Sequence, residues 1–218
     1  MTQATPPRRR PAWKLYLLIL VCVAPVVASY LAYYVFPPSE RTNYGTLIEP
    51  QRPVPPINSR LVHAPGSGAG QAGAAEGAVD AWRSRLQSDG LSALKGKWLM
   101  VTTDAGACPL ACAEKLFFMR QTHVSLGKER DRFLRVLLVT DDVPLPAAIL
   151  AAHPDLVVLQ MKQEAVGALF PVAADARLAD HVFVIDPLHN LMLRFPKSPD
   201  FPKTRGDLLK LLRASRIG

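Results

Sequence analysis

The chain has 218 residues and a formal net charge of +8, which suits one domain of about 100–150 residues with additional segments. Its basic residues are not interleaved with aromatic residues in the pattern that stacks on nucleic acid, so the charge does not indicate a nucleic-acid-binding protein. Its three cysteines are too few for a disulfide-rich secreted scaffold.

The N-terminal part predicts a membrane anchor. Residues 1–14 form a basic tail, and residues 15–36 are apolar and uncharged, long enough to cross a bilayer as one helix with aromatic residues at both ends. A cleaved signal peptide is the rival interpretation, but it would need small residues at its cleavage site, where this chain has Tyr and Phe. Because Arg8, Arg9, Arg10 and Lys14 precede the span, we expect a cytoplasmic N-terminus and a C-terminal part on the opposite side of the membrane.

Residues 37–79 are rich in Pro and Gly and predict a tether between the membrane and a globular head. Four prolines fall within residues 43–56, which we expect to be extended and not packed. Residues 65–78 are rich in Gly, Ala and Ser and predict a flexible loop. A tether of this kind lets the head reach a partner in the same membrane.

Residues 80–218 show alternating strands and helices, which favours an α/β sandwich with a central sheet. Apolar runs predict strands at 98–102, 133–139, 156–160 and 182–185, and residues 191–195 pair back as a hairpin. A helix is expected to follow the first strand, with short helices at 146–153 and 163–170. Thr204 and Asp207 predict a capping box at the start of a final amphipathic helix.

The stretch Cys108-Pro109-Leu110-Ala111-Cys112 carries the clearest chemistry. Residues i and i+4 share one helix face, so the two sulfurs can meet as a disulfide or as two thiolate ligands of a soft metal. Pro109 suits the first helical position, and the positive end of a helix favours thiolates. Cys22 lies in the apolar run, where we expect no chemistry.

The order of strand, cysteine-bearing helix and strand resembles the thioredoxin superfamily. Within it, residues 86–212 are most similar to the SCO/SenC family of copper-binding cytochrome oxidase assembly proteins. The features that carry the resemblance are the membrane anchor, residues 88–97 as the hairpin entry to the core, the CPxxC motif with three residues between its cysteines, and Asp180-His181 before the strand at 182–185.

The resemblance implies a thioredoxin-like fold in which Cys108, Cys112 and His181 bind one copper ion, as Cu(I) or Cu(II). It also implies a copper chaperone, and not an enzyme in the turnover sense, that supplies the dinuclear copper centre of cytochrome c oxidase subunit II or another copper-receiving subunit. The implied location is a bacterial inner membrane with the head in the periplasm, and a mitochondrial inner membrane is less favoured.

Two other functions stay open. A membrane-anchored thiol–disulfide oxidoreductase would use Cys108 and Cys112 as its redox pair. Residues 179–182 lack the proline that thioredoxin-like reductases place opposite their cysteines, which favours metal binding. The third function is an oxidase assembly factor that binds no metal and acts by docking.

Other side chains near these positions are less suited as metal ligands. His123 follows Cys112 by eleven residues on the same predicted helix, too far along its axis. We expect His153 and His189 to lie in exposed loops and Met119 to lie in the core. Asp104 and Glu114 are expected to be solvated charges.

Overall fold

The structure is a computed structural model that describes residues 13–34, 43–56, 58–65, 76–173, 176–215 and 217. The chain divides into two compact units, with the boundary between Thr42 and Asn43. Residues 1–12 of the predicted basic tail and residues 66–75 of the predicted flexible loop lie outside the described residues.

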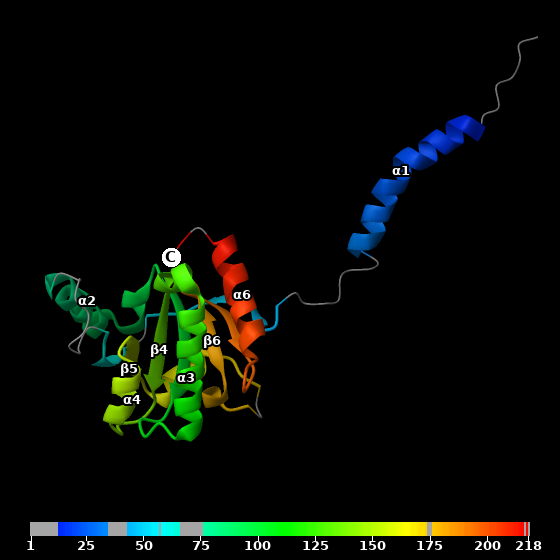
Figure 1. Cartoon of the computed structure of the whole chain (residues 1–218). Helices are drawn as coiled ribbons and strands as arrows, with labels where there is room; N and C mark the ends of the chain where they lie inside the picture. The colour runs from blue at the N-terminus through cyan, green and yellow to red at the C-terminus, as the bar shows by residue number, and fades with distance from the viewer. Residues whose placement is uncertain are drawn as a thin grey trace, which may run out of the picture. The chain divides into compact units, whose positions relative to one another are not determined.

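The first unit contains helix α1 (Trp13–Tyr34), which has Pro25 inside it (Figure 1). The helix has 22 residues, of which an 18-residue stretch has a mean hydropathy of 2.4, and none of its residues is buried within the unit. At about 1.5 Å per residue, such a helix matches the roughly 30 Å hydrocarbon core of a bilayer. The helix therefore fits a single-pass membrane protein.

The second unit is built on a mixed seven-stranded sheet with the order β1-β7-β6-β3-β4-β5-β2. Strands β3, β4 and β5 are parallel, and the other pairs are antiparallel. The strands are β1 (Thr46–Pro53), β2 (Arg60–His63), β3 (Trp98–Asp104), β4 (Phe133–Val139), β5 (Leu156–Gln160), β6 (Val182–Ile185) and β7 (Asn190–Phe195). The predicted strands are confirmed, and β4, β5 and β6 have the predicted bounds.

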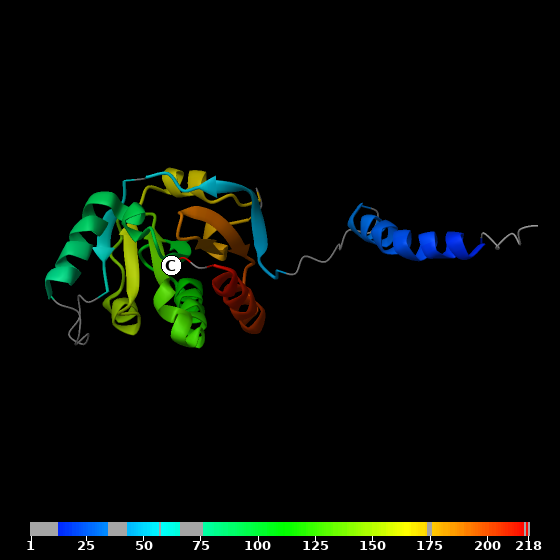
Figure 2. The ribbon, with the colours of Figure 1, turned by 90° about the horizontal axis from the view of Figure 1, so that it is seen from above.

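Helices cover both faces of this sheet, as Figure 2 shows from above. On one face α3 (Leu110–Ser125), α4 (Ala147–Ala152) and α6 (Phe201–Ala214) enclose a core that includes Cys112 and, as expected, Met119. On the other face α2 (Glu76–Asp89), the 3-10 helix η1 (Gly90–Leu94) and α5 (Gln163–Leu169) enclose a second core. Two further 3-10 helices, η2 (Gly127–Arg132) and η3 (Leu178–Asp180), precede β4 and β6. The α/β sandwich with a central sheet is thereby confirmed.

The expectation of an unpacked tether over residues 43–56 is wrong, because β1 lies there and pairs with β7. Strand β2 likewise falls within the predicted tether and pairs with β5. Both are the outermost strands of the sheet. Pro50 and Pro53 fit β1 because one side of an edge strand has no neighbouring strand. A proline nitrogen on that side has no hydrogen to donate, but the sheet loses no hydrogen bond. The folded head therefore begins before residue 80.

Two local predictions are also corrected. The residue that caps α6 is Asp200, whose side chain accepts from the backbone N–H of Lys203. Thr204 and Asp207 are buried inside that helix and form no capping box at its start. Residues 88–97, expected as a hairpin entry, form the end of α2, the 3-10 helix η1 and a turn that leads into β3.

Candidate functional site

Cys108 and Cys112 form a disulfide with a Cα–Cα distance of 5.1 Å. Cys108 lies in the loop between β3 and α3 with a φ of 41°, and Pro109 is the N-cap of α3 instead of its first helical residue. Only Cys112 is therefore helical, so the pair does not share one helical face as the sequence suggested. Cys112 is fully buried, whereas 7% of Cys108 is exposed.

The loop that carries Cys108 is fixed by Gly106 and Asp141. The backbone N–H of Gly106 donates to Oδ1 of Asp141 at 2.8 Å, and that oxygen also accepts from the N–H of Val143 at 3.3 Å. A Cβ at Gly106 would lie 1.7 Å from the carbonyl oxygen of Val143. Only glycine allows the two backbones to approach this closely. Neither role was found from the sequence, because Gly106 and Asp141 meet only through tertiary packing.

Lys115 links the cysteine-bearing helix to the segment before His181. Its Nζ lies 3.0 Å from Oδ2 of Asp104 and donates to the carbonyl oxygens of Thr103 and Ala179. Burial lowers the pKa of Lys115, and the charge and hydrogen bond of Asp104 oppose that shift. Asp104 is therefore half of a largely buried ion pair, and the expectation that it is a solvated charge is wrong.

His181 follows η3 and immediately precedes β6. Its Nδ1 lies 2.8 Å from the carbonyl oxygen of Phe195, and its own carbonyl accepts from Oγ1 of Thr102 at 3.0 Å. Because a carbonyl can only accept, the hydrogen bond assigns the proton of the neutral ring to Nδ1 and the lone pair to Nε2. Nε2 is buried and has no hydrogen-bond partner among the described residues. An orphaned lone pair of this kind fits a ligand nitrogen.

The structure brings His181 to the same end of the sheet as the cysteines, but it does not bring the three side chains together. Thr102, which holds the backbone of His181, lies on β3, and β3 leads directly into the loop of Cys108. The His181 ring packs against Phe183 with 6.1 Å between ring centroids. Phe183 belongs to the core on the α5 face, whereas both cysteines belong to the core on the α3 face. Within the described part of the chain, no three His, Cys, Asp or Glu side chains are grouped to hold a metal in this disulfide-bonded state.

The other histidines have structural partners or are buried. His123 lies near the end of α3, with Nδ1 3.6 Å from a carboxylate oxygen of Asp155. His153 and His189 are 4% and 2% exposed, so the expectation that both lie in exposed loops is wrong. Burial lowers the pKa of each, and nearby Arg135 lowers that of His153 further.

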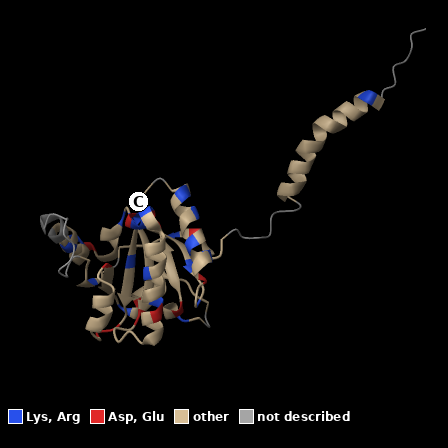
Figure 3. Cartoon of the chain, in the orientation of Figure 1, with Lys and Arg blue, Asp and Glu red and all other residues tan. Residues whose placement is uncertain are grey.

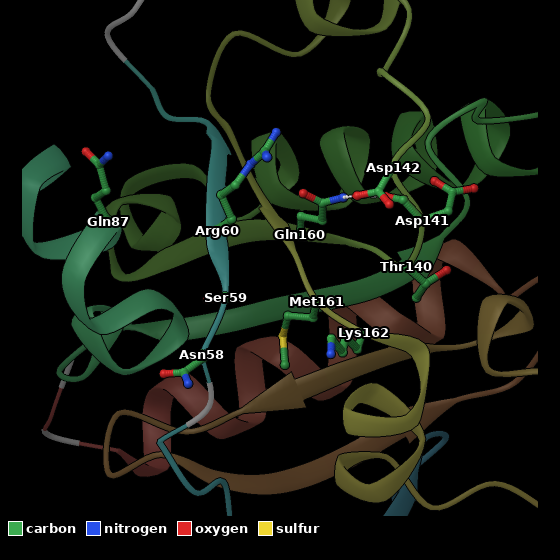
Figure 4. A pocket seen from close by; sticks show the side chains of 10 residues that line it. All are labelled: Asn58, Ser59, Arg60, Gln87, Thr140, Asp141, Asp142, Gln160, Met161 and Lys162. Atoms are coloured by element: carbon green, nitrogen blue, oxygen red, sulfur yellow. Dashed lines mark hydrogen bonds between the residues drawn. The ribbon is translucent and has the colours of Figure 1, made fainter.

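Two pockets flank the cysteine loop. A pocket of about 270 Å³ lies between α3 and the segment around η3, lined by Ala111, Phe118 and Val182 among others. A pocket of about 540 Å³, lined mostly by residues with polar side chains, lies beyond the ends of β4 and β5, where Gln160 donates to Asp142 at 2.7 Å (Figure 4). Acidic residues gather along this loop edge of the sheet, where the tip of β4 points (Figure 3). Basic residues lie at the same edge, since Arg60 and Lys162 line one pocket and Lys115 and Lys197 line the other.

This arrangement defines a thioredoxin-like dithiol protein. Strand β3 leads into the cysteine loop, α3 carries a buried cysteine in its first turn, and the adjacent strand β6 begins at the same end of the sheet. The family described as transmembrane-like, thioredoxin-like, C-terminal domain matches residues 98–215. The chain belongs to this family.

None of the curated proteins matches the chain. Among solved structures, copper-bound ScoI from Arabidopsis thaliana is 16% identical and has a TM-score of 0.45, covering 57% of this chain and 89% of that chain. Apo Sco1 from Thermus thermophilus is 18% identical with a TM-score of 0.48, covering 81% and 98%. The thioredoxin domain of a thiol-disulfide oxidoreductase from Bacteroides vulgatus is 13% identical with a TM-score of 0.39, covering 56% and 84%.

Proposed function

We propose that the chain is a membrane-anchored copper chaperone of the SCO type, in which Cys108, Cys112 and His181 bind one copper ion when the disulfide is reduced. The observation that carries the proposal is the buried, unpartnered Nε2 of His181 at the cysteine end of the sheet. Two thiolates and one imidazole form a soft ligand set that suits Cu(I). The hydrogen bond from Nδ1 to Phe195 keeps the lone pair on the nitrogen that would bind the metal.

Binding requires two changes in this chain. The disulfide must accept two electrons and two protons from a thiol donor, which leaves Cys108 and Cys112 as thiols. The cysteine loop and the His181 ring must also come together, because the ring now packs against Phe183 of the other core. Copper is the cargo, and it would leave by ligand exchange between thiolates of the chaperone and of its receiver, with His181 released first.

The proposed receiver is cytochrome c oxidase subunit II or another copper-receiving oxidase subunit. This part of the proposal is supported by the CPxxC and Asp180-His181 motifs and by the membrane anchor. The proposed location is the bacterial inner membrane, with the head in the periplasm.

Anaerobic Cu(I) titration of the reduced full-length chain in detergent tests the proposal. The chain should bind one equivalent, Cys108→Ser with Cys112→Ser should abolish binding, and His181→Ala should weaken binding at least tenfold. His63→Ala, on the outermost strand β2, is the matched control and should bind like the wild type. Wild-type affinity in His181→Ala would contradict the assigned ligand set.

A second candidate function is thiol–disulfide exchange, which the closed disulfide and the separated His181 ring favour. The Cys108 thiolate would attack a partner disulfide, form a mixed disulfide and release one partner thiolate. Cys112 would then attack Cys108, release the second partner thiolate and close the disulfide, so that two electrons pass to the partner. Repeated reduction of a test disulfide by a chain that binds no copper would establish this function. A chain that does neither would support the docking-only assembly factor.

A further inference from the structure

Phe195, the last residue of β7, contacts both His181 and the N-terminal residues of the second unit. Its carbonyl oxygen accepts from Nδ1 of His181 at 2.8 Å. Its ring is fully buried and stacks on the ring of Tyr44, with centroids 6.4 Å apart and planes 29° apart. Tyr44 and Gly45 directly precede β1, so one residue contacts both the candidate ligand and the start of the folded head.

Gly45 makes this contact possible. A Cβ at that position would lie 2.9 Å from Cε1 of Phe195, so any larger residue must displace the ring or the strand. The backbone N–H of Gly45 donates to Oδ2 of Asp207 at 2.8 Å, and Asp207 is 3% exposed on α6. A buried carboxylate satisfied by a backbone N–H fixes that backbone firmly.

Tyr44 is held by the same helix. Its hydroxyl oxygen accepts from the backbone N–H of Asp200 at 3.0 Å, and Nζ of Lys203 lies 5.4 Å from the centre of its ring. Tyr44 and Gly45, together called the clasp, therefore attach to α6 and press on Phe195. Beyond the clasp, Thr46 pairs with Arg194, which extends the restraint along β7.

We propose that the clasp positions His181 through Phe195, so that the first residues of the folded head set which ring nitrogen is available to copper. This inference rests on the proposed function only in making His181 a copper ligand. The carbonyl of Phe195 can hold Nδ1 only while the end of β7 stays in place. In the sequence, residues 35–42 separate α1 from the second unit. His181 is therefore positioned by residues that directly follow this connection.

The test uses the reduced, copper-free, full-length chain in detergent, with ¹⁵N-labelled histidine. In the wild type, the His181 ring should show the Nδ1–H tautomer. Gly45→Ala should move a substantial share of that signal to the Nε2–H tautomer and weaken Cu(I) binding about tenfold. Gly206→Ala is the matched control, because a Cβ there meets nothing within 4 Å although Gly206 adjoins Asp207 on α6.

Tyr44→Ala is the second variant, which leaves the Gly45 backbone unstrained and should shift the tautomer in the same direction. An unchanged tautomer in a folded Gly45→Ala chain, or in Tyr44→Ala if Gly45→Ala does not fold, overturns the inference. The proposed function fails separately, if His181→Ala binds Cu(I) like the wild type. The tautomer measurement contains no copper, so the two failures are distinguishable.

Discussion

The ammonium of Lys115 lies 3.0 Å from the carboxylate of Asp104, and only about a tenth of either side chain is exposed. This ion pair lies one helical turn beyond Cys112, and Lys115 also donates to the carbonyl of Ala179, two residues before His181. The pair thus joins the three elements that carry the candidate site.

Lys115→Met should destabilise the head by about 2–4 kcal/mol, because it leaves the largely buried Asp104 carboxylate without its ion-pair partner. Urea unfolding of the full-length chain measures the loss. Lys197→Met is the control, since Lys197 pairs with Asp180 but is 71% exposed, and its effect should stay within about 0.5 kcal/mol. Equal effects of the two variants would contradict the structural role of Lys115.

Gly106→Ala should destabilise the head by about 2 kcal/mol or more, because the new Cβ would collide with the backbone oxygen of Val143. The displaced loop should also make the Cys108–Cys112 disulfide reduce faster with dithiothreitol. Gly167→Ala is the control, because the nearest atom to its Cβ lies 4.0 Å away. Unfolding curves and reduction rates that match in the two variants would show that the loop accommodates a Cβ at position 106 without loss of stability.

Cys108 should be the first cysteine alkylated after reduction, because Cys112 is fully buried and Cys108 is 7% exposed. A Cys22→Ser background removes the third cysteine, which is exposed on α1. Timed labelling with iodoacetamide, followed by mass spectrometry, should show Cys108 reacting at least several-fold faster. Faster labelling of Cys112 would assign the attacking thiol to the helical cysteine instead.

His189 should make the head less stable as the pH falls from 7 to 5. Burial, followed by the charge of Lys95, lowers the pKa of His189 below 6.5, against the opposing charge of Asp186. The unfolded chain therefore binds a proton as the pH falls through about 6.5, and the folded chain binds it only at lower pH, so folding loses stability across that interval. Asn tolerates the φ of 73° at this position.

His189→Asn should accordingly lose about 1 kcal/mol less stability than the wild type between pH 7 and pH 5. Urea unfolding at both pH values measures the difference. Part of the pH dependence should remain, since burial lowers the pKa of His153 as well. An identical pH dependence in the variant and the wild type would exclude His189 as its source.

The position of the basic residues predicts that the head lies outside the cytoplasm. A reporter enzyme that is active only after export, fused to the C-terminus, should be active in a bacterial host. Replacing Arg8, Arg9 and Arg10 with Glu should reduce that activity, because these are the three Lys or Arg residues that precede α1. Activity of a cytoplasm-only reporter at the same position would reverse the assigned orientation.

The predicted elements that the structure confirms are those whose local sequence already indicates burial. Strands β4, β5 and β6 are near-continuous apolar runs, because a central strand is covered on both faces, and their bounds followed from that pattern. The length of an apolar, uncharged run likewise sufficed for α1. The spacing of Cys108 and Cys112 sufficed to predict that their sulfurs can meet, as the disulfide confirms.

The remaining features depend on segments that are distant in the sequence. Strand β1 contains prolines and exposed side chains, so only its pairing with β7 shows that it is part of the sheet. Gly45 and Asp207 are 162 positions apart, and neither has a local signal for their buried hydrogen bond. The face toward which the His181 ring turns was also decided by packing against Phe183. Composition and spacing determined the long apolar helix, the central strands and the proximity of the two cysteines, because these follow from short-range burial and geometry. Only the folded chain decided which polar groups are buried together, because that depends on contacts between residues far apart in the sequence.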